Sequence, residues 1–429
     1  MMYMTKMLDN TSDNLIAVIG GGPAGMMAAA TAAELGATVV IFEKNKQLGR
    51  KLRITGKGRC NVTNDCQTAE FMSNVPVNGR FIWSALDRFS PLDTINMFEA
   101  LGVPLKTERG RRVFPVSDKA GDIAGAMVKK CQRAGVKFVN DEVLDVCSDS
   151  NHKWKIILKE SEMVFSKVII CTGGMSYPLT GSDGDGYRFA KKLGHNITQL
   201  SPSLVPIVCQ DHECSEMQGL SLKNVGLKII QLIGEKRKVV FDDFGEMMFT
   251  HFGVTGPMVL SASAHLSDIE QKDYRIIIDL KPALNDTKLD TRLLSDFSKY
   301  SNRIFANSLD DLLPQKMIPI IVKRSGIDPY KKVNSITKTE RRKIIELLKA
   351  FEIKPNRFRP IEEAIITRGG IDNKQINPKT MQSKICDGIY FAGEIIDVDA
   401  YTGGFNLQIA FSTGVLAGEN AANSLINKD

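Results

Sequence analysis

The first apolar stretch of the chain is divided by glycines into a predicted strand, turn, helix and second strand. "LIAVIG", from Leu15 to Gly20, is a short β-branched run, and the "GGGPAG" that overlaps its end has the composition of a turn. "MMAAATAAELG" predicts an alanine-rich helix that ends at Gly36, and "ATVVIFEK" predicts the next strand. From Leu15 to Phe42 the only charge is Glu34, but the glycines favour a βαβ unit over a membrane span.

This predicted βαβ unit carries the glycine spacing of a dinucleotide-binding turn. Gly20, Gly22 and Gly25 fit the pattern Gly-x-Gly-x-x-Gly between the strand and the helix. Gly20 allows the tight turn, Gly22 lets the backbone approach a pyrophosphate, and Gly25 lets helix and strand pack closely. Glu43 ends the second strand, where a carboxylate can bind ribose hydroxyls. The alternative is a glycine-rich turn beside a solvated Glu43, but the flanking elements favour dinucleotide binding.

Two later segments favour FAD over NAD as the dinucleotide. "KVIICTGG", which ends at Gly174, predicts a buried strand, and "GIYFAGEIID", which ends at Asp397, predicts another. The second is followed by a glycine turn and a long helix, which would bring a second helix N-terminus to the same crevice. Such a positive dipole end suits a ribityl phosphate or the N1/C2=O edge of a flavin, which becomes anionic on reduction. The alternative is an ordinary strand–helix unit of an α/β sheet.

A basic, glycine-rich loop follows the second strand. From Lys44 to Arg59 the chain has seven Lys or Arg and no acid. The loop is not a Walker A loop, because the leading glycine is absent and Gly58 replaces the required Ser or Thr. We expect it to form the third wall of the crevice, with Arg59 and Asn61 contacting the pyrophosphate or the flavin. The alternative is a solvated basic loop.

Composition restricts the class of protein. The chain has 429 residues, 43% hydrophobic and 24% charged, as in a globular protein with two domains or one domain carrying an insertion. A net charge of +7 is compatible with an anionic ligand but too small to indicate nucleic acid. The eight cysteines form no Cys-x-x-Cys pair, and the five histidines are dispersed. We expect a cytoplasmic protein without a signal peptide, metal ion, membrane segment or nucleic-acid partner.

Six motifs together make the sequence resemble one family of flavoproteins. They are "GGGPAGMMAA", "GRKLRITGKGRCNVTN", "GGMSYPLTGSDGDGY", "FTHFGVTGP", "EEAIITRGGID" and "IYFAGEIIDVDAYTGGFNLQIAFSTG". From about Asn14 to Asn423 the chain is similar to the aminoacetone-oxidase-like, or BaiN-like, family. The resemblance implies an α/β fold with a two-dinucleotide-binding-type FAD domain (Rossmann-like) interrupted by an inserted domain. It also implies non-covalent FAD and an oxidoreductase activity, but no particular substrate.

The apolar pattern between the motifs agrees with an insertion. Residues 203–282 contain alternating and short apolar runs that predict antiparallel strands, as in a small barrel. Residues 285–352 show apolar residues at helical spacing. We therefore expect the FAD-binding domain to comprise residues 1–200 and 356–429, with residues 201–355 inserted between them.

The motifs and the resemblance give one set of residues expected to bind FAD and a smaller set expected near the substrate. The substrate-pocket candidates are Tyr177, Thr367, Arg368 and Tyr401, and Arg368 could hold a substrate carboxylate; a surface role is the alternative for Tyr177 and Arg368. No residue is assigned as a catalytic acid or base, because the flavin N5 itself accepts or donates the hydride. The FAD-binding candidates are Gly20, Gly22, Pro23, Ala24, Gly25, Glu43, Lys44, Arg50, Lys51, Thr55, Gly56, Gly58, Arg59, Cys60, Asn61, Val143, Thr172, Gly173, Gly393, Glu394, Gly403, Gly404, Phe405 and Asn406.

Cys60 and Cys66 raise the alternative of a redox disulfide, because flavin-dependent disulfide reductases place two cysteines soon after the dinucleotide motif. Here five residues separate the two cysteines, where those enzymes have four. The intervening "NVTND" has a turn composition that is poor for the helix that would align two thiols. No second strand–GxGxxG–helix unit for NAD(P)H is present in the sequence. We therefore expect Cys60 to pack beside the cofactor.

Two classes of function are consistent with these features. The first is an FAD-dependent oxidoreductase that transfers a hydride between flavin N5 and a small amine, amino ketone or enone. Its flavin would be reoxidised by oxygen or coupled to NAD(P)H as a transient reductant. The second is a flavin-binding protein that acts on tRNA or as a redox partner, although no RNA-binding module is visible in the sequence. The sequence does not indicate an oligomeric state.

Overall fold

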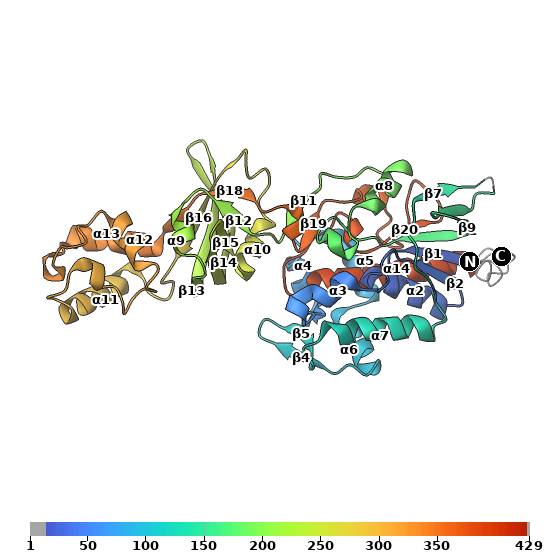
Figure 1. Cartoon of the computed structure of the whole chain (residues 1–429), viewed down its shortest axis with the longest axis horizontal. Coiled ribbons are helices and arrows are strands. Elements are labelled where there is room, and N and C mark those ends of the chain that lie inside the picture. The colour runs from blue at the N-terminus through green and yellow to red at the C-terminus, as the bar shows by residue number, and fades with distance from the viewer. Residues whose placement is uncertain (1–13, 150, 427–429) are drawn as a thin grey trace. The chain divides into compact units, whose positions relative to one another are not determined.

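The computed structural model describes residues 14–149 and 151–426, which form two compact units (Figure 1). The cofactor unit contains the residues up to Ser203 and those from Ile361 onward, and the inserted unit contains Leu204–Pro360. The chain thus leaves the cofactor unit after Ser203 and returns at Ile361, where the sequence led us to expect residues 200 and 356. Among the described residues, no helix is both long and apolar enough to cross a membrane.

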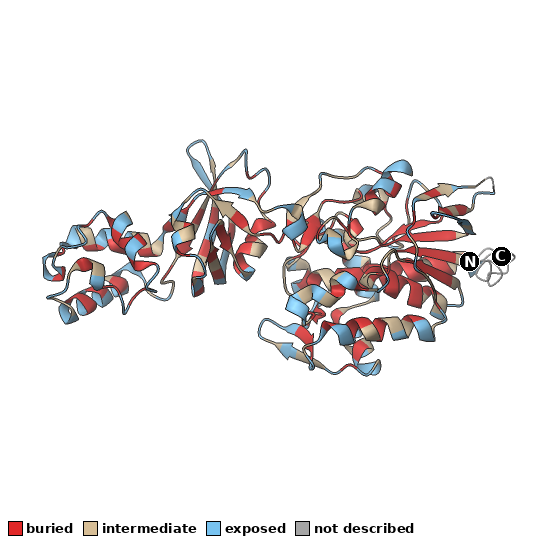
Figure 2. Ribbon diagram, viewed as in Figure 1, coloured by how far each residue is buried: buried red, intermediate tan, exposed pale blue. Residues whose placement is uncertain are grey.

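A five-stranded parallel sheet forms the centre of the cofactor unit. Its strands are hydrogen-bonded in parallel. All but the half-buried edge strand of residues 137–139 are buried on both faces, which explains their continuous apolar runs (Figure 2). Three residues of the central strand, Ile16, Ala17 and Val18, are fully buried. In order across the sheet the strands are β20 (Ile389–Phe391), β10 (Lys167–Ile170), β1 (Leu15–Ile19), β2 (Thr38–Phe42) and β6 (Lys137–Val139).

Two helices, α2 (Pro23–Glu34) and α14 (Phe405–Ile426), pack closely and run in the same direction (Figure 1). Two glycines of α14 make this approach feasible. A Cβ atom at Gly414 would lie 2.5 Å from the Ala24 carbonyl oxygen, and one at Gly418 would lie 2.2 Å from that of Ala28. Gly414 lies beside the first turn of α2, but α14 begins nine residues earlier, at Phe405. At 1.5 Å per residue, the N-terminus of α14 therefore extends roughly 14 Å past the N-terminus of α2.

Smaller elements surround this core. The strand β11 precedes the first crossing and β19 follows the second, and the two pair antiparallel with Pro202 opposite Thr367. Two three-stranded sheets have the orders β3-β5-β4 and β7-β8-β9. These elements are α3 (Arg50–Ile54), β3 (Thr63–Asn64), α4 (Thr68–Ser73), α5 (Trp83–Arg88), α6 (Pro91–Ala100), β4 (Leu105–Glu108), β5 (Arg112–Pro115), α7 (Ala120–Arg133), β7 (Asp145–Ser148), β8 (Trp154–Ile157), β9 (Glu162–Phe165), α8 (Asp185–Lys192), β11 (Ser201–Ser203) and β19 (Ile366–Arg368).

The inserted unit joins a seven-stranded antiparallel sheet to a group of helices and has a core of its own. The sheet order is β17-β16-β13-β14-β15-β12-β18. The elements are β12 (Ile207–Cys209), α9 (Glu213–Glu216), β13 (Ser221–Ile233), β14 (Lys236–Thr250), β15 (Gly253–Thr255), α10 (Pro257–Ser263), β16 (Asp273–Asp279), α11 (Asp286–Lys299), α12 (Ile318–Ser325), α13 (Lys338–Lys349), β17 (Phe351–Ile353) and β18 (Pro355–Phe358).

This sheet differs from the sequence-based expectation in two ways. The described strands do not close into a barrel, because the edge strands β17 and β18 are not hydrogen-bonded to each other. In addition, both edge strands come after the helical segment, outside residues 203–282. Each contains only three or four residues, which is too short for an alternating pattern to reveal, and their pairing partners lie far away in the sequence.

Candidate cofactor site

The turn between β1 and α2 carries the three glycines of the motif, and the chain itself requires glycine at two of them. Gly20 has a φ of 103°, and a Cβ there would lie 2.5 Å from the Cys171 carbonyl oxygen. A Cβ at Gly25 would lie 1.9 Å from the Gly20 carbonyl oxygen. Gly22, which caps α2 just before Pro23, is extended, and a Cβ there would meet no atom within 4 Å. The chain itself does not require glycine at this position, so Gly22 fits an approaching pyrophosphate.

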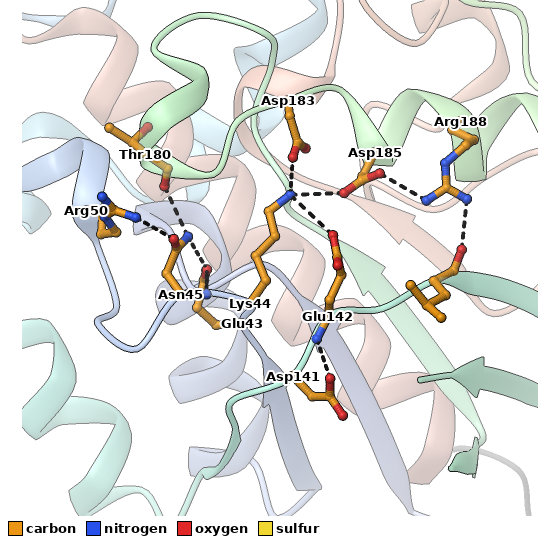
Figure 3. A network of polar contacts seen from close by, with 11 residues as sticks. Glu43, Lys44, Asn45, Arg50, Asp141, Glu142, Thr180, Asp183, Asp185 and Arg188 are labelled. Carbon is orange, nitrogen blue, oxygen red and sulfur yellow. Dashed lines mark hydrogen bonds and ion pairs between the residues drawn. The ribbon is translucent and has the colours of Figure 1, made fainter. Parts of the chain in front are cut away.

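Glu43 stands at the carboxyl end of β2, beside the same turn. Its Oε2 accepts a hydrogen bond from Gly21 N (2.8 Å), and its Oε1 accepts two from the backbone and side chain of Asn45 (2.9 and 2.7 Å). Asn45 also donates to the Thr180 carbonyl oxygen (3.2 Å) and accepts from Arg50 Nη1 (2.6 Å; Figure 3). Arg50 therefore fixes this corner through Asn45, while the Glu43 carboxylate keeps lone pairs that can accept from a ribose.

Lys44 is held by a cluster of carboxylates rather than left as a free cation. Its Nζ pairs with Asp183, with Asp185 (3.0 Å) and with Glu142 (4.0 Å; Figure 3). Burial would lower the pKa of Lys44, but the hydrogen bonds to Asp183 and Asp185 outweigh it and raise the pKa. Arg188 of α8 donates to Asp185 from the other side (2.9 Å). This network fastens the loop before α8 to the end of β2.

Arg59, expected to contact the cofactor, is engaged by the chain's own acids. Its guanidinium forms ion pairs with Glu108 and with Asp118 (2.7 Å), and it lies over the Phe114 ring at 4.2 Å from the centroid. Two carboxylates thus neutralise its charge. No local pattern in the sequence indicates this arrangement, because Glu108 and Asp118 follow 49 and 59 residues later.

Two other candidates carry buried polar atoms that match a ligand better. Asn61 Oδ1 and Thr172 Oγ1 are buried, and neither has a hydrogen-bond partner among residues 14–149 and 151–426. Buried polar groups without a protein partner call for a ligand or solvent partner. Asn61 lies just beyond Gly56 and Gly58, which have φ values of 57° and 83°. The backbone of this loop therefore adopts conformations that favour glycine.

The same loop meets the start of α14, as expected for walls of one crevice. Asn64 Nδ2 donates to the Gly403 carbonyl oxygen (3.1 Å). A Cβ at Gly404 would lie 2.4 Å from the Thr63 carbonyl oxygen. Gly403 and Gly404 have φ values of 128° and 97° and lead directly into Phe405. The structure therefore brings together two glycine-rich motifs that are more than 300 residues apart.

Lys51 and Glu394 form the polar centre of the site with two further residues. Lys51 Nζ donates to Glu394 Oε2 and to Ser176 Oγ, both at 2.6 Å. Glu394 Oε1 accepts from Ser176 Oγ and from Thr367 N, both at 2.9 Å. Thr367 Oγ1 accepts from the backbone of Met175 (2.7 Å). Four separate segments thus converge here, and three of these residues were candidates from the sequence. Ser176 was not among them, although it lies in one of the motifs.

The two tyrosine candidates differ in surroundings. Tyr177 is 36% exposed and has a φ of 53° in the loop after β10. Tyr401 is half-buried, and its backbone donates to Asn74 O (2.9 Å). The Asn406 side chain forms two hydrogen bonds with the Ala400 backbone. Its Oδ1 accepts from Ala400 N (3.0 Å), and its Nδ2 donates to Ala400 O (2.8 Å). Asn406 therefore shapes the turn before α14.

The remaining candidates line the same part of the fold. Arg368 ends β19 in register with Ser201. Val143 and Gly393 are buried, and Ala24 packs against Gly393. Gly173 has a φ of 77°, and Thr55 Oγ1 donates to the Leu52 carbonyl oxygen (2.7 Å).

The two cysteines of the loop are free thiols that are poorly suited to redox exchange. Cys60 is fully buried, and burial raises its pKa to about 12. Burial, together with the nearby Glu70 carboxylate, raises the pKa of Cys66 to about 11. Thiol–disulfide exchange requires a thiolate, which neither side chain supplies near neutral pH. The geometry thus favours flavin chemistry over disulfide chemistry.

Taken together, these residues fit FAD. Gly22 leaves room for a pyrophosphate at the start of α2, Glu43 stands where a ribose would lie, and Gly403 and Gly404 lead into the second helix N-terminus. Asn61 supplies a buried acceptor between them. Both helix starts lie at the carboxyl edge of the parallel sheet, where ligands of open α/β folds bind.

Comparisons with known proteins agree with this site. A family model described as HI0933-like protein Rossmann domain matches residues 14–420. The 3-dehydro-bile acid delta(4,6)-reductase of Clostridium scindens is 29% identical over 413 residues, covering 95% of this chain and 99% of the relative. The ribosomal RNA dihydrouridine synthase of Escherichia coli is 29% identical over 398 residues, covering 92% of this chain and 95% of the relative.

Solved structures show the same fold at low sequence identity. The 3-ketosteroid-delta4-(5alpha)-dehydrogenase of Rhodococcus jostii RHA1 superposes with a TM-score of 0.52 at 14% identity, covering 97% of this chain and 98% of that chain. The family match extends over nearly the whole described chain. The predicted resemblance to BaiN-like flavoproteins, the α/β fold and the FAD-dependent oxidoreductase class are confirmed, and the chain belongs to the HI0933-like Rossmann family.

Proposed function

We propose that this chain reduces a carbon–carbon double bond conjugated to a carbonyl group, with non-covalent FAD as the hydride donor and NAD(P)H as its reductant. The observation that carries this proposal is the reaction shared by two relatives of equal identity. A delta(4,6)-reductase of a 3-dehydro-bile acid saturates double bonds conjugated to the 3-oxo group. A dihydrouridine synthase saturates the uracil double bond that is conjugated to a ring carbonyl. The substrates are unrelated, so the reaction is the common element.

The site supplies the groups that this reaction needs. When bound, reduced flavin supplies a hydride from N5 to the carbon β to the carbonyl. Negative charge then develops on the carbonyl oxygen, and a nearby cation or N–H dipole stabilises it. Arg368 is the cation among the substrate-pocket candidates, and Thr367 next to it is tied to the Lys51–Glu394 centre. We assign Arg368 to the carbonyl oxygen, with Tyr177 and Tyr401 lining the pocket.

The second candidate substrate is a uridine in ribosomal RNA. Two of the relatives, from Escherichia coli and Haemophilus influenzae, are named for that activity. The inserted unit is compatible with a polyanion, since residues 204–360 contain 25 Lys or Arg against 20 Asp or Glu, a net charge of +5. RNA binding would run against the sequence-based expectation of no nucleic-acid partner. It would also differ from the tRNA alternative considered from the sequence, because the substrate would be ribosomal RNA.

An anaerobic titration tests the proposal and separates the substrates. The FAD-loaded protein is reduced with NADPH and then mixed with a 3-oxo-Δ4 steroid or with a uridine-containing ribosomal RNA fragment. In a separate sample, the oxidised protein is mixed with an amine. We expect one of the first two to restore the oxidised flavin spectrum and to gain two hydrogens by mass spectrometry. Bleaching of oxidised flavin by the amine, with no reoxidation by either unsaturated compound, would overturn the proposal in favour of an amine oxidase.

A further inference from the structure

Asp399 is a buried acid that the proposed reaction has not yet used. It is 1% exposed, and neither carboxyl oxygen has a hydrogen-bond partner among the residues that the structure describes. Ser203, which ends β11, is also fully buried with an unpartnered hydroxyl. Ionising a carboxyl group in such a place is costly, because nothing replaces the water that would solvate the charge. Asp399 is therefore held in its neutral form more strongly than a surface acid.

The groups around Asp399 act on it in opposite directions. Burial raises the pKa of Asp399 to about 6, and the Asp397 charge adds to this rise. Ser203 and the positive charge of Arg368 oppose it. Asp399 lies two residues before Tyr401, and its backbone bridges to Val77. The acid thus sits beside the predicted substrate-pocket residues, in electrostatic contact with the cation assigned to the substrate carbonyl.

The buried thiol of the loop is less able to give up a proton. Burial raises the pKa of Cys60 to about 12, well above neutral. A general acid works best when its pKa lies near the working pH. Asp399 meets that condition, since its pKa is raised to about 6.

We propose that Asp399 is the proton store of the reduction, a general acid that starts neutral and supplies the proton for the carbon α to the carbonyl. This inference rests on the proposed function. The balance is complete: a hydride adds to the β carbon, the double bond is lost, and the proton forms the new C–H bond at the α carbon. Asp399 becomes a carboxylate beside Arg368 and is reprotonated from solvent, while NAD(P)H restores the reduced flavin.

The protonation of Asp399 can be observed without turnover. Infrared spectra of the FAD-loaded wild type, Asp399→Asn and the matched control Asp387→Asn are compared from about pH 5 to about pH 8. The Asp387 side chain is 86% exposed and pairs with Lys167 at 3.5 Å, so the control removes a carboxylate that solvent reaches. We expect a protonated-carboxyl band that fades over this range in the wild type and control and is absent from Asp399→Asn. The same band in all three proteins would overturn the inference.

Kinetics then test whether the stored proton is used. We expect Asp399→Asn to slow reoxidation of the flavin by the unsaturated substrate by about 10²- to 10⁴-fold, the usual contribution of general acid catalysis. Reduction of the flavin by NADPH should be unchanged, and Asp399→Glu should recover part of the lost rate. Wild-type rates should fall above about pH 6, and this dependence should vanish in Asp399→Asn.

The outcomes separate the two proposals. If neither the steroid nor the RNA fragment reoxidises the wild-type flavin, the proposed function fails, and the role of Asp399 in it fails with it. If the wild type turns over and Asp399→Asn does so at the same rate and with the same pH profile, only the proton-store inference fails.

Discussion

Gly22 is the position at which cofactor binding separates most cleanly from folding. Its backbone is extended, with φ −77° and ψ −177°, so a residue with a side chain adopts it without strain. A Cβ there would meet no atom of the chain within 4 Å. We expect Gly22→Val to change the free energy of unfolding of the cofactor-free protein by less than about 0.5 kcal/mol.

FAD binding should respond very differently. The valine side chain would occupy the space through which the pyrophosphate reaches the N–H groups at the start of α2. Hydrogen bonds to charged groups contribute about 1.5–3 kcal/mol each. Loss of two of them weakens binding by about 3–6 kcal/mol, which corresponds to roughly 10²- to 10⁴-fold in the dissociation constant.

Gly25→Ala is the matched comparison within the same turn. Its Cβ would lie 1.9 Å from the Gly20 carbonyl oxygen, so the turn and α2 must separate. We expect this variant to lose at least about 1–3 kcal/mol of stability even without cofactor. Urea unfolding of the cofactor-free proteins gives the stabilities, and titration with FAD gives the affinities. Normal FAD affinity in Gly22→Val, or equal destabilisation in both variants, would refute the assignment of this turn to the pyrophosphate.

Three further predictions concern other parts of the site. Cys60→Ser should keep FAD and most turnover, and a thiol reagent at about pH 8 should leave Cys60 unmodified in the native protein, because burial raises its pKa to about 12. Lys51→Met and Glu394→Gln should show a coupling of about 1 kcal/mol in a double-mutant cycle of urea unfolding, since the pair is 2.6 Å apart and mostly shielded. The free energy of unfolding of the wild type should fall by roughly 3 kcal/mol relative to that of Asp399→Asn as the pH rises from about 4 to about 7. The reason is that a carboxyl group whose pKa is raised to about 6 stabilises the fold only while it is protonated. Thermal unfolding of both proteins at each pH measures this difference.

Much of the cofactor unit could be predicted because its signals are local. The strand β1, the glycine turn and α2 follow one another without interruption, and each has a distinct composition. The glycine pair before α14 is equally visible in the sequence. Such motifs place backbone, and backbone is what binds the phosphates in this class of fold. The backbone elements that we assign to the site could therefore be recognised in the sequence alone.

The side-chain partners could not be predicted, because they come from distant segments. Lys51 meets Glu394 across 343 positions, and Arg59 meets Asp118 across 59. No local pattern distinguishes a lysine that will pair inside the site from one that will face solvent. Asp399 was missed for a related reason, since burial without a partner is a property of the folded chain. The short edge strands β17 and β18 were likewise set by distant pairing.

The basic loop shows how the folded chain changes the meaning of a charge pattern. In sequence, seven cations without an acid suggest that side chains neutralise the cofactor's phosphates. In the structure, Lys44, Lys51 and Arg59 each form an ion pair with carboxylates of the chain itself. Their charges are largely compensated before any ligand arrives. These three side chains are therefore less available to a pyrophosphate, and the N–H groups and dipoles at the starts of α2 and α14, which glycines leave accessible, become the more important attraction that we expect for it.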